Sequence, residues 1–361
     1  MSPQQHRSPI LIRRLAVLAV AVGLIAAACS SDDDGTETSD GGEVVVITHD
    51  SFQIDDELVA AFESETGLIL TVQRGGDAIE VVNQAILTVD DPQGDVLFGI
   101  DDATLGRALD ADLFEPYVPE RLADVDDDLI VDPEGRATPV DHGAVCINYD
   151  AEWFDAEGLE PPASLDELRD EAYADLLVVP NPASSSPGLA FLTATVAEFG
   201  DDGWVDYWSD LRANGVVTTA GWSDAYYGRF SGGSGEGDRP LVVSYGSSPP
   251  AEVMEQERLP EEGPTGVIES TCVRQIELAG VLSNAANPEG ARRFIDFLLG
   301  DAFQASVPLS MFVYPVVDGV ELPEVFQRFA VVPSDPYRLD PQVIAAERDE
   351  WISTWTDTVQ R

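Results

Sequence analysis

The chain has 361 residues, enough for two folded lobes, and carries 67 Asp and Glu against 19 Arg with no Lys, for a formal net charge of −48. Such a charge repels phosphates, so a nucleic-acid-binding function is excluded. It also makes anionic membrane surfaces poor partners, and it raises the local concentration of cationic solutes.

Residues 1–28 show the pattern of a secretory signal peptide. Arginines precede an apolar run, 15–28, that is shorter than the about 20 residues needed to span a bilayer. Small residues then precede Cys29, which resembles a bacterial lipobox, and we expect Cys29 to be lipidated. The alternative is an ordinary signal peptide with a chance cysteine. Residues 29–42 lack large apolar side chains and are expected to form a disordered tether, so a monomer would sit outside the cytoplasm, held to the cell membrane by its lipid alone.

From residue 43 onward, strand-like and helix-like segments alternate. We expect strands at 44–48, 70–72 and 95–100, and helices at 55–67, 78–87 and 104–113. This β-α-β-α order is typical of a parallel sheet with covering helices.

A second α/β unit is expected to begin near residue 149, after which the chain returns to the first unit. The sequence predicts further strands at 176–179, 216–219, 241–245 and 272–282, and helices at 189–199, 204–212, 287–300 and from 340 onward. The last helix places Trp351 and Trp355 on one apolar stripe. The expected fold class is therefore α/β with two lobes, an interlobe cleft and two hinge strands near 141–147 and 272–279. Lobe I is expected to comprise 43–140 plus 280–361, and lobe II 141–279.

Two cysteines remain after Cys29, namely Cys146 and Cys272, and both lie in the expected hinge strands. An even pair in an oxidising compartment favours a disulfide. Two buried free thiols are the alternative.

Recognisable catalytic and metal-binding motifs are missing from the sequence. It contains no HExxH, P-loop, GxSxG or zinc-type Cys/His spacing. His49 and His142 lack a paired nucleophile and are expected to be structural. The acidic run 124–128 has Leu129 where an EF-hand loop needs Gly. We therefore expect a binding protein and no enzyme, with neither cofactor nor metal.

Polar and aromatic side chains gather where the expected strands end. In open α/β sheets, ligands bind outside the carboxyl ends of the strands, and two facing lobes would bring these ends together in one cleft. The residues concerned are Asp50, Asp101, Asp102, Ser185, Ser186, Trp222, Tyr226, Tyr227, Tyr245, Ser247 and Ser248.

The residue types indicate the chemistry of a ligand. Carboxylates favour a cation or an amino group, and aromatic faces favour a flat cationic ring, at about 1–2 kcal/mol each when desolvated. Hydroxyls beside the N–H groups of a helix start favour an anion such as phosphate. A flat cation with an optional phosphate tail fits all three sets, although a single Ser or Asp in a loop is more often a turn former.

These segments resemble the periplasmic thiamine-binding proteins of bacterial thiamine ABC transporters. The similarity runs from about residue 44 to 360 and is carried by the order and spacing of the segments THDSF (48–52), DVLFGID (95–101), NPASSSPG (181–188), GWSDAY (221–226), SYGSSP (244–249), YPV (314–316) and AERDEW (346–351). The resemblance implies a type II periplasmic-binding-protein fold, with thiamine or its mono- or diphosphate held in the cleft. It also implies that an ABC permease is the partner. It implies contacts at Asp101, Asp102, Ser185, Ser186, Trp222, Tyr245, Ser247 and Ser248.

The chain departs from this family at two positions. Phe312 stands before Tyr314 where the family can have Trp, and Ala251 stands near a family Tyr. Phe312 can still stack on a ring and Ala251 cannot, so we include Phe312 and Tyr314 in the expected site and expect an altered preference among thiamine and its phosphates. The rival predictions are a ferric-iron or polyamine solute-binding protein and, less favoured, a thiamine-salvage enzyme.

Overall fold

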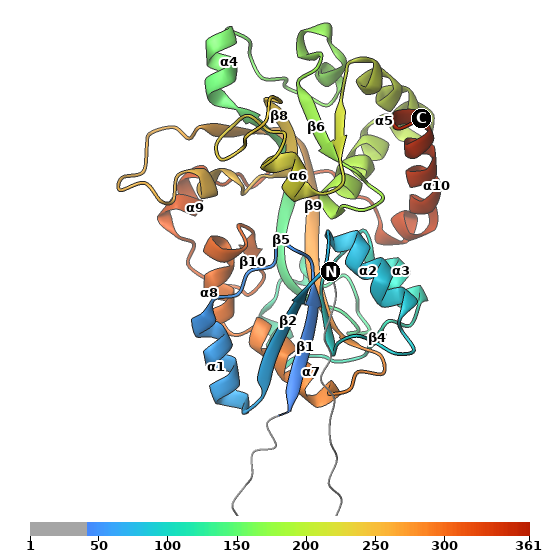
Figure 1. Cartoon of the computed structure of the whole chain (residues 1–361), viewed down its shortest axis with the longest axis vertical. Coiled ribbons are helices and arrows are strands. Elements are labelled where there is room, and N and C mark those ends of the chain that lie inside the picture. The colour runs from blue at the N-terminus through green and yellow to red at the C-terminus, as the bar shows by residue number, and fades with distance from the viewer. Residues whose placement is uncertain (1–41) are drawn as a thin grey trace, which may run out of the picture. The chain divides into compact units, whose positions relative to one another are not determined.

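The computed structural model describes residues 42–361 (Figure 1). The predicted signal peptide, Cys29 and residues 30–41 of the predicted tether lie outside the described residues. Between residues 42 and 361, every helix is too short or too polar to cross a membrane.

The first three strands form a parallel sheet, as the sequence predicts. β1 (Glu43–Thr48) lies between β2 (Ile69–Arg74) and β3 (Val96–Asp101) and pairs in parallel with both. β3 is buried along its whole length, which is typical of a strand covered on both faces. The helices between and after these strands are α1 (Asp56–Thr66), α2 (Ala78–Leu87) and α3 (Leu105–Asp110).

Two long strands connect the two halves of the molecule. β5 (Thr138–Asp150) and β9 (Thr265–Leu282) pair antiparallel at the centre of a sheet with the order β2-β1-β3-β9-β5-β8-β6-β7, and they run between the halves in Figure 1. Two short strands, β4 (Phe114–Glu115) and β10 (Tyr314–Pro315), pair with β9 and β5. A disulfide joins Cys146 of β5 to Cys272 of β9.

The second half holds three strands of its own. β6 (Leu177–Pro180) pairs in parallel with β7 (Val217–Thr219) and with β8 (Leu241–Tyr245). The helices here are α4 (Ala151–Glu157), α5 (Ser186–Ala213) and α6 (Trp222–Tyr226). The two predicted helices 189–199 and 204–212 are the two arms of α5, which meet at Gly200 with φ 67° and ψ 177°. Glycine adopts this conformation far more readily than other residues, so the break falls there.

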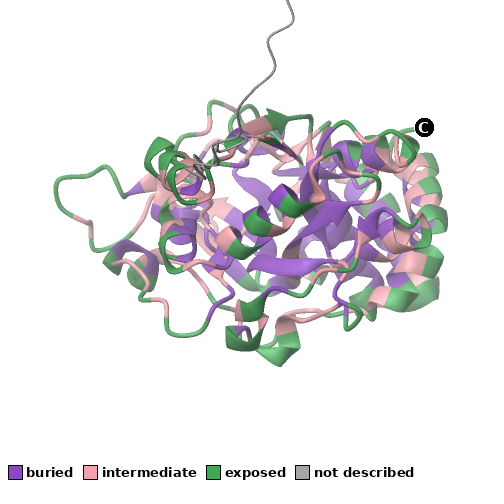
Figure 2. Ribbon diagram, turned by 90° about the horizontal axis from the view of Figure 1, so that it is seen from below, coloured by how far each residue is buried: buried purple, intermediate pink, exposed green. Residues whose placement is uncertain are grey.

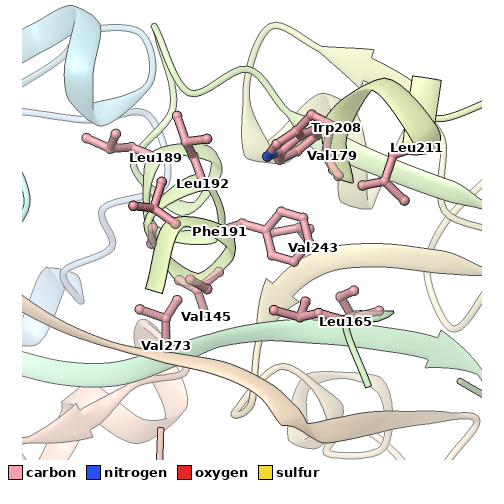
Figure 3. Close-up of a cluster of buried hydrophobic side chains, with 14 of the residues drawn as sticks. Val145, Leu165, Val179, Leu189, Phe191, Leu192, Trp208, Leu211, Val243 and Val273 are labelled. Atoms are coloured by element: carbon pink, nitrogen blue, oxygen red, sulfur yellow. The ribbon is translucent and has the colours of Figure 1, made fainter. Parts of the chain in front are cut away.

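Each half has its own hydrophobic core. The first core lies around β1, β3 and the helix α7 (Pro288–Leu298), with Phe62 and Phe294 among its buried residues. The second core lies around α5, where Phe191 and Trp208 meet edge to face at 5.7 Å, and Val145 and Val273 reach it from β5 and β9 (Figure 3). The central strands are mostly buried, and the helices around them expose their outer faces (Figure 2).

The C-terminal segment differs from the predicted lobe boundary. After α8 (Asp301–Ser310) and α9 (Glu324–Phe329), Tyr337 pairs with β9, and the chain crosses to the second half. There α10 (Pro341–Val359) packs along α5, with the Trp355 ring edge to face on Trp208 at 5.5 Å. The segment 341–359 therefore packs mainly on the second core, although α10 also contacts α3 of the first half. The predicted Trp351/Trp355 stripe needs an apolar surface to cover, and α5 provides one.

The start of α10 permits a test of this docking. The Asp340 side chain caps the helix by accepting a hydrogen bond from Gln342 N at 2.8 Å, ahead of Pro341 at the first helical position. Asp340→Ala is expected to lower the free energy of unfolding by about 1 kcal/mol, because a helix-start N–H loses its partner. Denaturant unfolding measures this change. Asp340→Asn retains the cap, and an equal loss in both variants would contradict the assignment.

Candidate functional site

A cavity of about 360 Å³ lies where loops from both halves meet, at the carboxyl ends of β1, β2 and β8. This volume is within the range of small-molecule sites. The first half contributes loops after β1, β2 and α8, the second half contributes the starts of α5 and α6 and the loop after β8, and β9 contributes the floor.

Eight of the thirteen predicted ligand residues line this cavity, and five do not. The lining residues are Asp50, Ser186, Trp222, Tyr226, Tyr227, Tyr245, Ser248 and Phe312. Phe312 has a φ of 54°, which is unfavourable for a residue other than glycine, and such strain concentrates at ligand sites.

Asp101 does not line the cavity but contacts Ser186, which does. Its carboxylate accepts hydrogen bonds from Thr104 N at 2.9 Å, from Gln275 Nε2 at 2.9 Å and from Ser186 Oγ. The side chain is 1% exposed, so it positions Ser186 and does not face the cavity.

Asp102 differs from the prediction, because it points away from the cavity. Its carboxylate accepts from Ile276 N at 3.3 Å and lies 3.9 Å from the Arg274 guanidinium. Burial and the neighbouring Asp101 raise the pKa of Asp102 to about 7. β3 ends at Asp101, and the turn that follows directs the Asp102 side chain toward Ile276 and Arg274.

Tyr314 also differs from the prediction. Because β10 pairs with β5, Tyr314 lies opposite His142, stacks on it at 5.6 Å and meets Phe326 edge to face at 5.1 Å. It lines a second cavity, together with Arg274 and Arg338.

Ser185 and Ser247 do not line the cavity, but each directly precedes a lining serine, Ser186 or Ser248, in the sequence. Both are completely buried, and their hydroxyls have no hydrogen-bond partner in the described part of the chain. Because both are buried and neither lines the cavity, they lie behind Ser186 and Ser248 and do not themselves face a solute.

The aromatic side of the cavity is a fixed cluster. Trp222, the first residue of α6, stacks on Tyr226 at 5.2 Å and meets Tyr227 edge to face at 5.6 Å. Its indole Nε1 donates to Ser244 Oγ at 2.9 Å, which holds the ring in one orientation. An aromatic ring whose orientation is fixed in this way is suited to stacking on a flat ring of a solute.

Asp77 is a lining residue that the sequence analysis missed. It precedes α2, and its carboxylate accepts from Ala78 N at 2.7 Å, Trp222 N at 3.0 Å and Ser186 N at 3.3 Å. One side chain of the first half thus meets the starts of two helices of the second. Burial raises the pKa of Asp77, and the hydrogen bond from Trp222 N opposes that rise. Its place between a predicted strand and a predicted helix is the signal that would have found it.

The floor of the cavity holds two more residues that were not predicted as ligand residues, His49 and Glu277. His49 Nε2 lies 3.0 Å from Glu277 Oε1. Burial lowers the pKa of His49 and raises the pKa of Glu277 to about 8. His49 was expected to be structural, but it faces the cavity. Glu277 lies inside a strand, and no local signal marks it.

A metal centre is not apparent in this site. Among residues 42–361, no group of three or more His, Cys, Asp or Glu side chains is placed to hold a metal ion.

A family profile of bacterial extracellular solute-binding proteins matches residues 91–331. The chain belongs to this family. This solute-binding protein is 29% identical to the thiamine-binding periplasmic protein of Salmonella typhimurium over 326 residues, which cover 88% of this chain and 94% of that relative.

Other relatives agree on the fold. A solved structure of a periplasmic thiamin binding protein matches with a TM-score of 0.77 and 28% identity, covering 88% of this chain and 96% of that one. Iron uptake protein A1 of Synechocystis is 26% identical over 304 residues, which cover 82% of each chain. The α/β fold of the solute-binding protein is thus that of periplasmic binding proteins. Family membership confirms that the chain is a binding protein outside the cytoplasm and not an enzyme.

Proposed function

We propose that this solute-binding protein captures thiamine or a thiamine phosphate and delivers it to the permease of an ABC importer. The proposal depends on the lining of the cavity. The ring of Trp222, which is held in one orientation, lines the same cavity as the carboxyl groups of Asp50 and Glu277. An aromatic face beside carboxylates suits a flat organic cation. The names of two relatives, the thiamine-binding periplasmic protein of Salmonella typhimurium and the periplasmic thiamin binding protein of known structure, point to the same solute.

Each part of the solute has a chemically matched set of residues. Trp222, Tyr227, Tyr245 and Phe312 offer ring faces to the pyrimidine or thiazolium ring. Asp50 and Glu277 accept hydrogen bonds from the amino group and lie close to the cationic ring. The hydroxyls of Ser186 and Ser248, backed by Ser185 and Ser247, receive the hydroxyl or phosphate end.

Asp77 bears on the choice among thiamine and its phosphates. A phosphate tail has to compete with this carboxylate for the N–H groups of Ser186 and Trp222. Two anions repel each other at such a distance. We therefore expect thiamine to bind more tightly than thiamine diphosphate.

Capture closes two lobes over the solute. Lobe I comprises 43–140 and 280–330, and lobe II comprises 141–279 and α10. The lipobox-like pattern before Cys29 supports attachment to the cell membrane through a lipid, and the signal-like segment 1–28 supports secretion. The protein acts as a monomer.

Titration of the purified protein with thiamine is expected to quench tryptophan fluorescence, because the ring of Trp222 lines the cavity. Isothermal titration with thiamine, its monophosphate and its diphosphate then ranks the three solutes. If none of the three produces a response, the proposal is wrong, and a thermal-shift panel that includes polyamines would identify the solute instead.

Ferric iron is the alternative that the iron uptake relative suggests. Three tyrosines line the cavity, but burial raises the pKa of the Tyr227 phenol, which disfavours the phenolate form that binds ferric ion. Tyr226 donates its hydroxyl to Glu252 at 2.7 Å, Tyr314 lines the second cavity, and burial raises the pKa of the Tyr245 phenol well above its usual value. We expect no colour change on addition of ferric ion, measured by visible absorbance.

A further inference from the structure

We propose that Glu277, at the floor of the cavity, selects a cationic solute by releasing to solvent the proton that it shares with Asp141 when such a solute binds. The inference rests on the proposed function. It identifies Glu277 as the residue that recognises the positive charge of the solute, and it adds that the protein loses one proton when the solute binds.

Three acids lie in one row across the sheet beneath the cavity. Glu277 of β9 is paired in register with Asp101 of β3 on one side and with Asp141 of β5 on the other. Residues directly opposite each other in neighbouring strands share a face, with Cβ atoms about 4.5–5.5 Å apart. The carboxyl groups are therefore close neighbours in a buried layer.

The three acids are not equally provided with hydrogen-bond donors. Asp101 receives hydrogen bonds from Thr104, Gln275 and Ser186. Asp141 is 2% exposed, and its Oδ2 has no partner among residues 42–361. Two ionised carboxylates cannot donate to each other, so a buried pair such as Asp141 and Glu277 is stable when it holds one proton between its members.

Cations that would neutralise the pair are scarce around it. The charged or titratable groups that act on the pair are His49 after β1, Asp77 before α2, Asp101 on β3 and Tyr245 on β8. Asp50 and Arg74, at the end of β2, lie one step further away and act on His49. Burial lowers the pKa of His49, which disfavours the charged form of this imidazole. Arg74 is exposed and donates its Nε to Phe52 O at 2.9 Å, so solvent screens its charge.

Glu277 is the member of the pair that a solute can reach. Its side chain is 19% exposed and lines the cavity together with Trp222 and Tyr245, whereas Asp141 does not line it. A solute cation that stacks on these rings comes near Glu277 and favours its ionised form. The bond that breaks is the O–H bond of the shared proton, and the proton passes to bulk water.

The sign of the pH dependence follows. Burial raises the pKa of Glu277 to about 8 and holds the pKa of Asp141 well above its usual value. Below pH 8 the free protein holds the proton, and a cation must displace it. Affinity therefore rises with pH, by up to about tenfold per unit for one released proton, and levels off above about pH 8. Burial lowers the pKa of His49, which moves its titration away from the range in which Glu277 titrates.

The experiment measures thiamine affinity from pH 6 to pH 9 by isothermal titration, in two buffers of different ionisation enthalpy. The wild-type protein is expected to bind about fivefold more tightly at pH 8 than at pH 7, because half of the proton has already left the free protein at pH 8, and to release about one proton to the buffer at pH 7. Glu277→Gln is expected to bind at least tenfold more weakly at pH 8 and to show no pH slope. Glu269→Gln, an exposed change on the same strand, keeps both the affinity and the slope.

The outcomes separate the two proposals. If wild-type affinity is independent of pH, if the observed heat is the same in both buffers, or if Glu277→Gln keeps the slope, the inference is overturned while thiamine capture stands. If the wild-type protein fails to bind thiamine at any pH, the proposed function is overturned. Proton release by the wild-type protein needs no variant, so the test holds even if Glu277→Gln does not fold.

Discussion

Replacing Cys146 and Cys272 together by serine is expected to lower the free energy of unfolding by about 2–5 kcal/mol. The disulfide joins residues 126 positions apart, and it links β5 to β9, the two strands that run between the cores. A closed loop of about 100 residues restricts the unfolded chain strongly, with about 4.7 kcal/mol expected from chain entropy alone. Both sulfurs are buried, so the serine hydroxyls also lose solvent contacts.

Denaturant unfolding with and without a reductant measures this effect. Reductant is expected to destabilise the wild-type protein and to leave the doubly substituted variant unchanged. This comparison separates the loss of the covalent link from any cost of burying serine. Equal stability of the wild-type protein in both conditions would show that the bond does not constrain the unfolded chain.

The sheet and most of the helices could be predicted from the sequence, because their signals are local. A continuous β-branched run predicts β1, and capping residues such as Asn287 and Asp340 mark the starts of α7 and α10. The association of Asp50, Trp222 and Tyr245 in one cavity was also accessible, since parallel strands place their carboxyl ends at one edge.

The features that could not be predicted from the sequence depend on pairing between strands that are distant in the sequence. The Trp351/Trp355 stripe predicts an apolar contact but does not say which core it covers, and only the pairing of Tyr337 with β9 carries α10 to α5. Tyr314 leaves the cleft because β10 pairs with β5. Neither pairing has a signature within its own segment.

The acidic floor is the strongest case of this limit. Asp101, Asp141 and Glu277 are far apart in the sequence and meet only through the register of β3, β9 and β5. A register change of one residue in either pairing would turn Glu277 to the opposite face from its partner. Irregularities between Phe98 and Ile100 and between Pro139 and Asp141 set this register, and sequence patterns do not locate such bulges.

Replacing Trp222 by alanine is expected to weaken thiamine binding by about 30- to 100-fold. A desolvated cation over an indole ring contributes about 1–2 kcal/mol, and the rings of Tyr226 and Tyr227, which rest on Trp222, lose the contact that orders them. Together these losses amount to about 2–3 kcal/mol, and each 1.4 kcal/mol is a factor of ten in affinity. Isothermal titration at one fixed pH measures the change.

Two control variants decide what a loss at Trp222 means. Trp222→Phe keeps an aromatic face but cannot donate to Ser244, so it is expected to retain most of the affinity if stacking is the dominant contribution. Trp153→Ala removes a half-buried indole that packs edge to face on Phe154 and does not line the cavity, so it is expected to leave affinity unchanged. If Trp222→Ala and Trp153→Ala bind thiamine equally well, the ring at 222 does not contact the solute. If Trp222→Phe loses as much affinity for thiamine as Trp222→Ala, the hydrogen bond from the indole to Ser244 contributes more than the aromatic face, because a ring without that hydrogen bond is not fixed in the orientation needed for stacking.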